Sequence, residues 1–470
     1  MSSKAEKEAF VSGLGGTSPS EVLAIACALP LLAETLGIWG NGFQSKSRAC
    51  FFSAVALSFS GVAAVTHPRS YLPAIYSMLF IFWAVAFIRA KSNLRLFEKE
   101  KVKQLTRRCA PSPALLTVFR STMMVYTAIS ILGVDFHVFP RRLAKTETFG
   151  TGLMDLGVGS FVLSGGLTSR SARRSVASNL DRTLRKTIPL LALGLLRLFT
   201  LKGIDYQEHT SEYGQHWNFF FTLAAVSLAS FFLENNFPRP FLVTPGISGF
   251  ALFCVYEALL GFVSIRSSNN DDRTTSLEAY VLSPHSGLHP RASLVARNKE
   301  GVASLVGFVA LHFIGCGLGR WIFRGCERGF WNSTGTSPRN QFIIQLWHAA
   351  LVSVLFSSVA AHRISRRLCN AAYGCWVTSI FLCVASLLCT LRLVARFSGV
   401  ACVDSDFLDP AIACINARML FVFLLANALT GLTNVSIDTM SVAETPALAL
   451  LLVYGFIVCG TPCAIPSIRS

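Results

Sequence analysis

Long apolar runs recur through this chain and constrain its fold more than any other feature. Stretches of about 20 mostly apolar residues follow one another along the whole sequence, and a helix of that length spans the hydrocarbon core of a bilayer. The composition agrees, because 52% of the residues are hydrophobic and only 14% are charged, whereas soluble domains carry about 25% charged residues. We therefore predict an all-α, polytopic membrane protein with a single transmembrane domain over residues 1–470.

These runs predict about thirteen transmembrane helices. The runs at 49–66 and 151–168 are the weakest of them. The N-terminal stretch MSSKAEKEAFVSGLGG has no short apolar segment followed by a small-residue cleavage site, so no cleavable signal peptide is expected. The predicted spans are 19–41, 49–66, 71–90, 114–134, 151–168, 187–204, 217–235, 240–265, 301–323, 342–361, 368–391, 418–436 and 446–466.

The charges between the runs predict the orientation of the chain. Residues 89–108 contain eight Lys and Arg and residues 170–186 contain six, whereas residues 205–216 contain none and three acids. Basic connections lie on the cytoplasmic side, so the loops at about 89–113 and 169–186 are expected there. The N-terminus is then lumenal and the C-terminus cytoplasmic. We read the net charge of +17 as topology signals and lipid-headgroup contacts, and expect no nucleic-acid partner.

Two further connections, at about 266–300 and 324–341, are rich in Ser, Thr, Asn and Gly and are expected to be variable surface loops. The 14 cysteines occur mostly singly inside apolar runs and include no CxxC pair. A cysteine in such a run behaves as a small hydrophobic residue, so we predict no metal site and no bound cofactor.

The stretch GVDFHVFPRRLAKTETFGTG (133–152) places many charges beside a predicted span. On one unbroken helix Asp135 and Lys145 would be about 15 Å apart along the axis and on different faces. A break at Pro140 would let the chain fold back and bring the carboxylate and the ammonium group together. Ionisable groups at that depth are functional candidates. The alternative is a structural ion pair, with Arg141 and Arg142 as anchors for lipid headgroups.

A second polar stretch, YQEHTSEYGQHWNFFFTL (206–223), places four ionisable residues along one side of a helix. They are Glu208, His209, Glu212 and His216, and the stripe ends at Trp217. Such a stripe suits either a metal ion or a wall of hydrogen-bonding groups for a polyol, and the absence of an HExxH order argues against zinc. Trp217 also fits an aromatic belt at the membrane interface.

Together, VDFHVFPRRLAKTETFGTGLMDLGVGSFV (134–162) and the second stretch resemble the GPI-anchor inositol acyltransferases, known as PIG-W in animals. The resemblance extends over nearly the whole chain. Two positions depart from the family pattern: Gly15 stands where an Asn is usual, and Lys299 replaces an Arg. The other similar segments are KEAFVSGLGGT (7–17), RNKEG (297–301), SRRLCNAAYGCWV (365–377) and FVFLLANALTGLTN (421–434).

The resemblance implies an activity in GPI-anchor biosynthesis. A fatty acyl chain, chiefly palmitoyl, would pass from acyl-CoA to the inositol of glucosaminyl-phosphatidylinositol, at the lumenal side of the endoplasmic reticulum membrane. Acyl-CoA (palmitoyl-CoA) would be a co-substrate, and membrane lipids would surround the protein. Asp135 and Lys145 match the family's catalytic pair, and we expect Asp135 to act as general base and Lys145 to stabilise the oxyanion.

Other polar residues are expected to bind the substrates. They are Arg141, Arg142, Glu208, His209, Glu212, His216, Trp217, Asn218, Asn298, Arg366 and Arg367. His209 and His216 are alternative bases. Two other kinds of function stay open: a lipid or solute transporter, in which the charged motifs form a translocation site, and a non-catalytic scaffold of GPI assembly.

Overall fold

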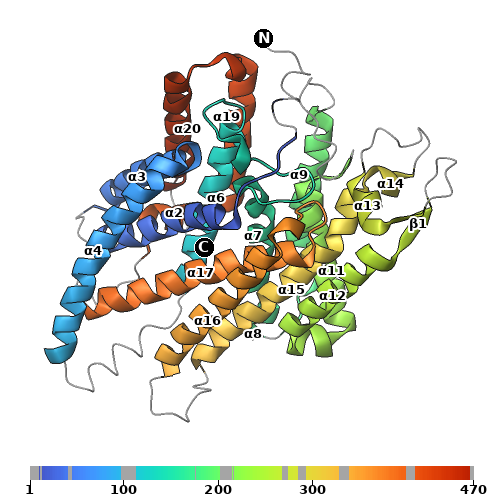
Figure 1. The fold of residues 1–470 in the computed structure, drawn as a ribbon, viewed down its shortest axis with the longest axis horizontal. Coiled ribbons are helices and arrows are strands. Elements are labelled where there is room, and N and C mark those ends of the chain that lie inside the picture. Colours follow the sequence, from blue (N-terminus) through green and yellow to red (C-terminus); the bar gives the residue numbers. More distant parts are fainter. Residues whose placement is uncertain are drawn as a thin grey trace.

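The computed structural model describes residues 10, 13–40, 45–96, 113–174, 176–201, 214, 216–266, 274–283, 293–327, 338–398 and 408–465. Helices dominate these ranges, which confirms the predicted all-α class. The sheet structure of the described residues is one antiparallel pair of three-residue strands, β1 (Ser264–Arg266) and β2 (Thr274–Ser276). With the short helices beside it, the pair lies at one edge of the molecule next to α12 (Figure 1).

The long helices are α2 (Pro19–Gly40), α3 (Lys46–Thr66), α4 (Pro68–Leu96), α6 (Pro113–Gly133), α7 (Leu153–Leu167), α9 (Leu180–Leu201), α11 (Phe219–Asn236), α12 (Pro245–Phe262), α15 (Lys299–Glu327), α16 (Pro338–Val359), α17 (Ala371–Phe397), α19 (Met419–Ser436) and α20 (Glu444–Ala464). The shorter helices are η1 (Arg141–Leu143), α8 (Arg170–Arg174), η2 (Arg239–Val243), α13 (Leu277–Leu282), α14 (Leu294–Arg297), η4 (Ala361–Arg363), α18 (Pro410–Ala417) and η5 (Thr439–Ser441).

Each of the thirteen predicted spans coincides with one of the long helices. Ten of the helices within the described ranges are long and apolar enough to cross a membrane, which confirms the membrane character of the chain. The other three are α7, with 15 residues, α9, which begins with the charged turn LDRTLRK, and α16, whose apolar part Ile343–Val359 is shorter than the ten. The full count of thirteen crossings stays a prediction.

Many helix starts follow directly from the sequence. Six helices begin with proline: α2, α4, α6, α12, α16 and α18. Proline is favoured in a first turn, because its missing N–H would have no partner there. Asn218, Asn370 and Asp409 precede α11, α17 and α18, and each side chain accepts a hydrogen bond from a backbone N–H of the first turn.

Burial divides the helices into a central and a peripheral set. In the apolar windows of α6, α2 and α17, 78%, 72% and 67% of the residues are buried, whereas the values for α4 and α19 are 22% and 17%. The long helix α17 runs across the middle of the molecule (Figure 1) and packs against α2, α4, α6, α7 and α16. The peripheral helices expose large apolar side chains such as Phe80 and Phe250, which suits a surface covered by lipid.

A buried ion pair joins two of the central helices. Arg392 of α17 donates from Nε to Oε1 of Glu34 at 2.5 Å and from Nη2 to Oε2 at 2.8 Å. Glu34, in α2, has no exposed surface. A buried charge without a partner is very unfavourable, so each group holds the other in place.

We expect Glu34→Gln to destabilise the protein by roughly 3–5 kcal/mol, because it removes the carboxylate charge that faces the buried Arg392 guanidinium. Thermal unfolding of the detergent-solubilised protein measures the effect. Asp181→Asn is the control, since Asp181 pairs with Arg185 on an exposed surface. Equal melting temperatures for the two variants would contradict the prediction.

Candidate functional site

The chain reverses direction directly after α6, which ends at Gly133, seven residues before the break predicted at Pro140. Arg141 closes the reversal by donating hydrogen bonds to three backbone carbonyls, those of Val134 at 2.8 Å, Phe136 at 3.0 Å and Phe139 at 3.1 Å. Burial lowers the pKa of Arg141 to about 10, while the negative charge of Asp135 acts in the opposite direction. Arg141 therefore fixes the conformation of the reversal by satisfying backbone carbonyls of residues that follow α6.

Asp135 lies in this reversal, half-buried. Its Oδ2 accepts a hydrogen bond from Nδ2 of Asn434 at 2.8 Å, which brings the end of α19 to the end of α6. The Oδ1 atom of Asn434 is buried and has no hydrogen-bond partner among the described residues. Lys145 is also half-buried and follows η1 by two residues. The pairing of Asp135 with Lys145 stays a prediction.

Sequence reasoning did not select Asn434 as a site residue. The available signal was that the family-like segment 421–434 ends on it.

The segment after Lys145 is organised by one buried carboxylate, that of Asp155 in the first turn of α7. It accepts hydrogen bonds from the backbone N–H of Thr146 at 3.2 Å, the Thr146 hydroxyl at 3.0 Å and the Gly152 N–H at 2.9 Å. Arg366, in the segment before α17, donates to it from Nε at 2.8 Å. Both side chains of this ion pair are buried, at 4% and 0% exposure.

The N-terminal segment packs on the same loop. Thr17 and Thr151 form a short antiparallel bridge, in which the Thr17 N–H donates to the Thr151 carbonyl at 2.7 Å. Gly16 and Gly150 both have positive φ angles, +80° and +127°, a conformation that glycine adopts most easily. A Cβ on Gly150 would also lie 2.3 Å from the Gly15 carbonyl oxygen. The close approach of the two segments therefore requires glycine.

A further ion pair fastens the loop to α2. Arg142 donates from Nη2 to Oε1 of Glu21 at 2.9 Å and from Nε to both carboxylate oxygens. The two side chains are 30% and 22% exposed, so this pair is more accessible to solvent than the pair of Asp155 and Arg366.

The second polar stretch joins the same network. Arg367 donates to the Glu147 carbonyl at 2.9 Å and to the buried carboxylate of Glu300 at 3.0 Å. Near Glu300, the Oδ1 atom of Asn298 accepts the backbone N–H groups of His216 and Trp217 at 2.8 and 2.9 Å. The segments that carry the sequence motifs are therefore connected. We call them the motif assembly, and its described residues are 134–155, 216–218, 298–300 and 366–367.

The remaining predicted site residues have different positions. Asn218 caps α11 and donates from Nδ2 to the Gly194 carbonyl at 3.1 Å. Glu208, His209 and Glu212 lie outside the described residues. Lys299, which replaces the family's Arg, donates to the carbonyls of Tyr280 and Ser283.

Four arginines that we expected to bind substrate phosphates hold partners within the protein. They are Arg141, Arg142, Arg366 and Arg367. In this conformation they stabilise the motif segments, and a direct contact with substrate stays a prediction for each of them. The pairing explains why basic residues lie on the predicted lumenal side, where topology alone would not place them.

A pocket of about 750 Å³ opens elsewhere, between α6, α7, α9, α11 and α19. One end is strongly basic, and the described residues of the lining include one acid, Glu234, whose carboxylate accepts the Ser178 N–H at 3.3 Å. The rest is apolar, with Phe161, Phe219 and Phe423 among its lining residues. The basic residues of the lining are Arg120, Arg170, Arg173, Arg174, Arg182 and Lys186.

The pocket follows α11 over most of its length. Residues Phe219 and Glu234 both line it, and they are separated by about 22 Å of helical rise. Glu234 marks the basic end, while Phe219 directly follows Asn218 and Trp217 of the motif assembly. The pocket therefore extends from the basic segment 168–186 towards the assembly, and it suits a long ligand with an anionic head and an apolar body.

Arg120 distinguishes this pocket from an ordinary lipid groove. It lies inside α6, a candidate membrane span, and its Nε atom is buried and has no hydrogen-bond partner among the described residues. A cation within a span is costly, which makes Arg120 a candidate functional residue. The pocket was not predicted from the sequence, because the basic residues of 169–186 were interpreted as topology signals and lipid-headgroup contacts, and because Arg120 is a single charge within an apolar run.

We expect Asp155→Asn to destabilise the protein by roughly 3–5 kcal/mol, because the variant removes the carboxylate charge that faces the buried Arg366. Arg142→Ala should cost about 1 kcal/mol or less, since the pair with Glu21 is partly exposed. Thermal unfolding in detergent compares the two variants. The opposite order of melting temperatures would show that Asp155 does not organise the loop.

Comparison with known proteins supplies the family. A model of the GWT1 family matches residues 3–465. GPI-anchored wall transfer protein 1 of Aspergillus fumigatus is 34% identical, over 98% of this chain and 97% of its own length. The phosphatidylinositol-glycan biosynthesis class W protein of Dictyostelium discoideum is 30% identical, over 97% and 96%. An uncharacterized protein of Arabidopsis thaliana is 37% identical over 73% of this chain and 71% of its own length. The motif segments, the polytopic fold and the match along nearly the full sequence together show that this chain belongs to the GWT1 family.

Proposed function

We propose that this protein is an acyltransferase of GPI-anchor biosynthesis, which moves a fatty acyl chain from acyl-CoA to the inositol of glucosaminyl-phosphatidylinositol. Membership of the GWT1 family supports the role in GPI-anchor biosynthesis. The proposal that acyl-CoA is the donor rests on one observation, the pocket with a basic end and an apolar body.

The two ends of the pocket match the two parts of acyl-CoA. The phosphates of CoA would bind at the basic end, where arginine side chains can make charge-assisted hydrogen bonds to phosphate oxygens. The acyl-pantetheine part would lie along the apolar lining towards Phe219. The thioester would then approach the motif assembly from within the membrane domain.

The acceptor hydroxyl needs a base, and Asp135 is the candidate. As the hydroxyl oxygen attacks the thioester carbonyl, its proton would pass to the Asp135 carboxylate. Lys145 would stabilise the negative charge on the carbonyl oxygen. The C–S bond then breaks, and CoA leaves as the thiolate or, after protonation, as the thiol.

Asn434 would position the base in this scheme. Its hydrogen bond to Oδ2 fixes the position of the Asp135 carboxylate. The Oδ1 atom of Asn434, which has no partner within the described part of the chain, is available to a second hydroxyl of the inositol ring. Direct transfer is favoured over an acyl-enzyme, because the motif shows no nucleophilic Ser or Cys paired with a base.

The endoplasmic reticulum membrane is the proposed location, with the motif assembly facing the lumen and the basic end of the pocket facing the cytoplasm. The positive-inside distribution supports this orientation. The CoA head would then bind from the cytoplasmic side, while the inositol lipid would be acylated towards the lumenal side.

Asp135→Asn and Lys145→Ala should each lower the acyltransferase activity of membranes by at least about a hundredfold, the usual scale for loss of a catalytic acid–base or oxyanion group. Asn434→Ala should lower kcat with a smaller change in KM for either substrate. The assay follows labelled acyl-CoA into the inositol lipid. Glu444→Gln is the control, since Glu444 lies on the same predicted face and is exposed.

Full activity of both Asp135→Asn and Lys145→Ala would refute the catalytic assignment. A chain that transports lipid or solute would give no acylated product in any variant. If the protein were a non-catalytic scaffold, the purified protein would not acylate the inositol lipid by itself. Acylation in membranes would then survive both substitutions, because another component would catalyse it.

Arg182→Ala should raise the KM for acyl-CoA about tenfold, the loss expected for one charge-assisted hydrogen bond to phosphate. Arg185→Ala is a matched control, because Arg185 lies on the same helix but pairs with Asp181 on the exposed surface. The KM for the inositol lipid should stay constant in both variants. An equal rise in KM for acyl-CoA in both would indicate a general charge effect and would contradict the proposed CoA site.

A further inference from the structure

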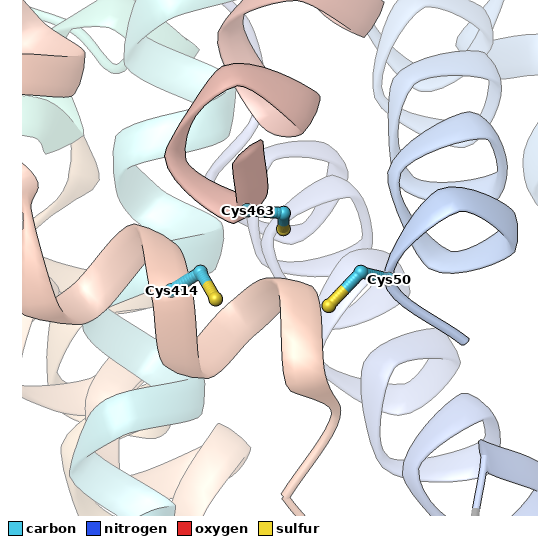
Figure 2. Close-up of side chains that lie close together, drawn as sticks. All are labelled: Cys50, Cys414 and Cys463. Carbon is cyan, nitrogen blue, oxygen red and sulfur yellow. The ribbon is translucent and has the colours of Figure 1, made fainter. Parts of the chain in front are cut away.

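Three cysteines that are far apart in the sequence meet in space. The sulfur atoms of Cys50, Cys414 and Cys463 all lie within 4.8 Å of one another. In Figure 2 the three side chains point towards a common centre, each from a different helix. Cys414 and Cys463 are half-buried and Cys50 is buried. Local sequence gives no sign of this cluster, because the cysteines belong to three separate segments without a CxxC pair.

The helices that carry the cysteines are held together independently of the thiols. The helices α3, α18 and α20 pack against one another. Ser53 of α3 donates to the Asp409 carboxylate at the start of α18 at 2.5 Å, and Arg418 at the end of α18 donates to the Ile465 carbonyl beyond α20 at 3.0 Å. The cluster is therefore preorganised by its surroundings, which lowers the cost of binding a ligand.

The cluster lies at the level of the basic end of the pocket. Ser121 of α6 donates to the Ile412 carbonyl of α18 at 3.0 Å, next to Arg120 of the pocket lining. By the predicted orientation this is the cytoplasmic face, where thiols are kept reduced and structural disulfides are rare. Three reduced thiols in one place favour a metal ion over a disulfide.

We propose that Cys50, Cys414 and Cys463 bind a thiophilic d10 metal ion, Zn²⁺ or Cu(I). A metal–sulfur bond of about 2.3 Å places sulfur ligands about 3.8–4.0 Å apart around one ion, a spacing compatible with the observed cluster. Each thiol releases its proton on binding. Three thiolates suffice for Cu(I), and Zn²⁺ would complete a tetrahedral site with a water molecule.

The surrounding charges are compatible with this site. The positive charges of Lys46 and Arg418 act on Cys414 and would offset the negative charge of three thiolates around one cation. The ion would join the start of α3 and the end of α20 to α18. Since α18 leads directly into α19, which carries Phe423 of the pocket and Asn434, the ion would stabilise the frame of the site without touching substrate.

The test uses the full-length protein, purified in detergent without chelators and without a histidine tag. Elemental analysis should find one Zn or Cu per chain, and the identity of the element separates the two ions. After anaerobic removal of the metal, added Co²⁺ should produce a thiolate-to-cobalt charge-transfer band, and added Zn²⁺ or Cu(I) should abolish it.

Cys414→Ser and Cys50→Ser should both lose the metal and the band, while Cys254→Ser, at an exposed cysteine outside the cluster, should keep them. Removal of the metal should lower the melting temperature of the wild-type protein by several degrees and leave that of Cys414→Ser unchanged. The Co²⁺ titration uses only the wild-type protein, so it tests the proposal even where a cysteine variant fails to fold.

Three outcomes would overturn the proposal. Wild-type protein that contains no stoichiometric metal and gives no charge-transfer band would show that the thiols only pack together. Metal retained in Cys414→Ser and Cys50→Ser would place the ion elsewhere. A disulfide between two of the three cysteines in protein isolated under thiol-blocking conditions would show an oxidised pair in place of a metal site.

Discussion

The requirement that a buried carboxylate be fully hydrogen-bonded shapes the candidate site. Asp155 has no exposed surface, and its charge is tolerated only because donors converge on it from two directions. Thr146 and Gly152 approach from the preceding loop, and Arg366 approaches from a segment 211 positions away. The loop that follows Lys145 consequently has a defined conformation, and the N-terminal segment packs on a surface that already exists.

The same physical rule separates structural charges from ligand-binding charges. Glu34 with Arg392 and Glu300 with Arg367 are matched pairs, in which each charge is compensated within the protein. The pocket lining is different, because its described residues include six cations and one carboxylate. An imbalance of that kind in a partly apolar cavity is unfavourable until an anion arrives. The pocket rather than the arginine pairs of the motifs is therefore the stronger candidate for binding phosphate groups.

Local features of the sequence predict much of the fold. The apolar runs predict the long helices of the described ranges and prolines mark many of their starts, but α6 already ends at Gly133, before Pro140. The sequence does not reveal which charges meet, because partners such as Asp155 and Arg366 are chosen by packing between distant segments. For the same reason the sequence predicts neither the contact of Asn434 with Asp135 nor the meeting of Cys50, Cys414 and Cys463. The basic residues of 169–186 were interpreted as topology signals and lipid-headgroup contacts, since the order of residues along the chain does not show that they line a cavity.

Three helices, α7, α11 and α19, connect the pocket with the motif assembly. This connection matters for the proposed reaction, in which the two substrates would bind from opposite sides of the membrane. The helix α7 carries Asp155 at its start and Phe161 in the pocket lining, and α11 begins beside Asn218 and continues along the pocket. On α19, Phe423 and Asn434 are about 16 Å apart along the axis. With the proposed donor at the basic end of the pocket and the proposed acceptor at the motif assembly, a connection of this length would let the two meet within the protein. The apolar lining would keep water from the thioester, and neither substrate would have to cross the bilayer for the transfer.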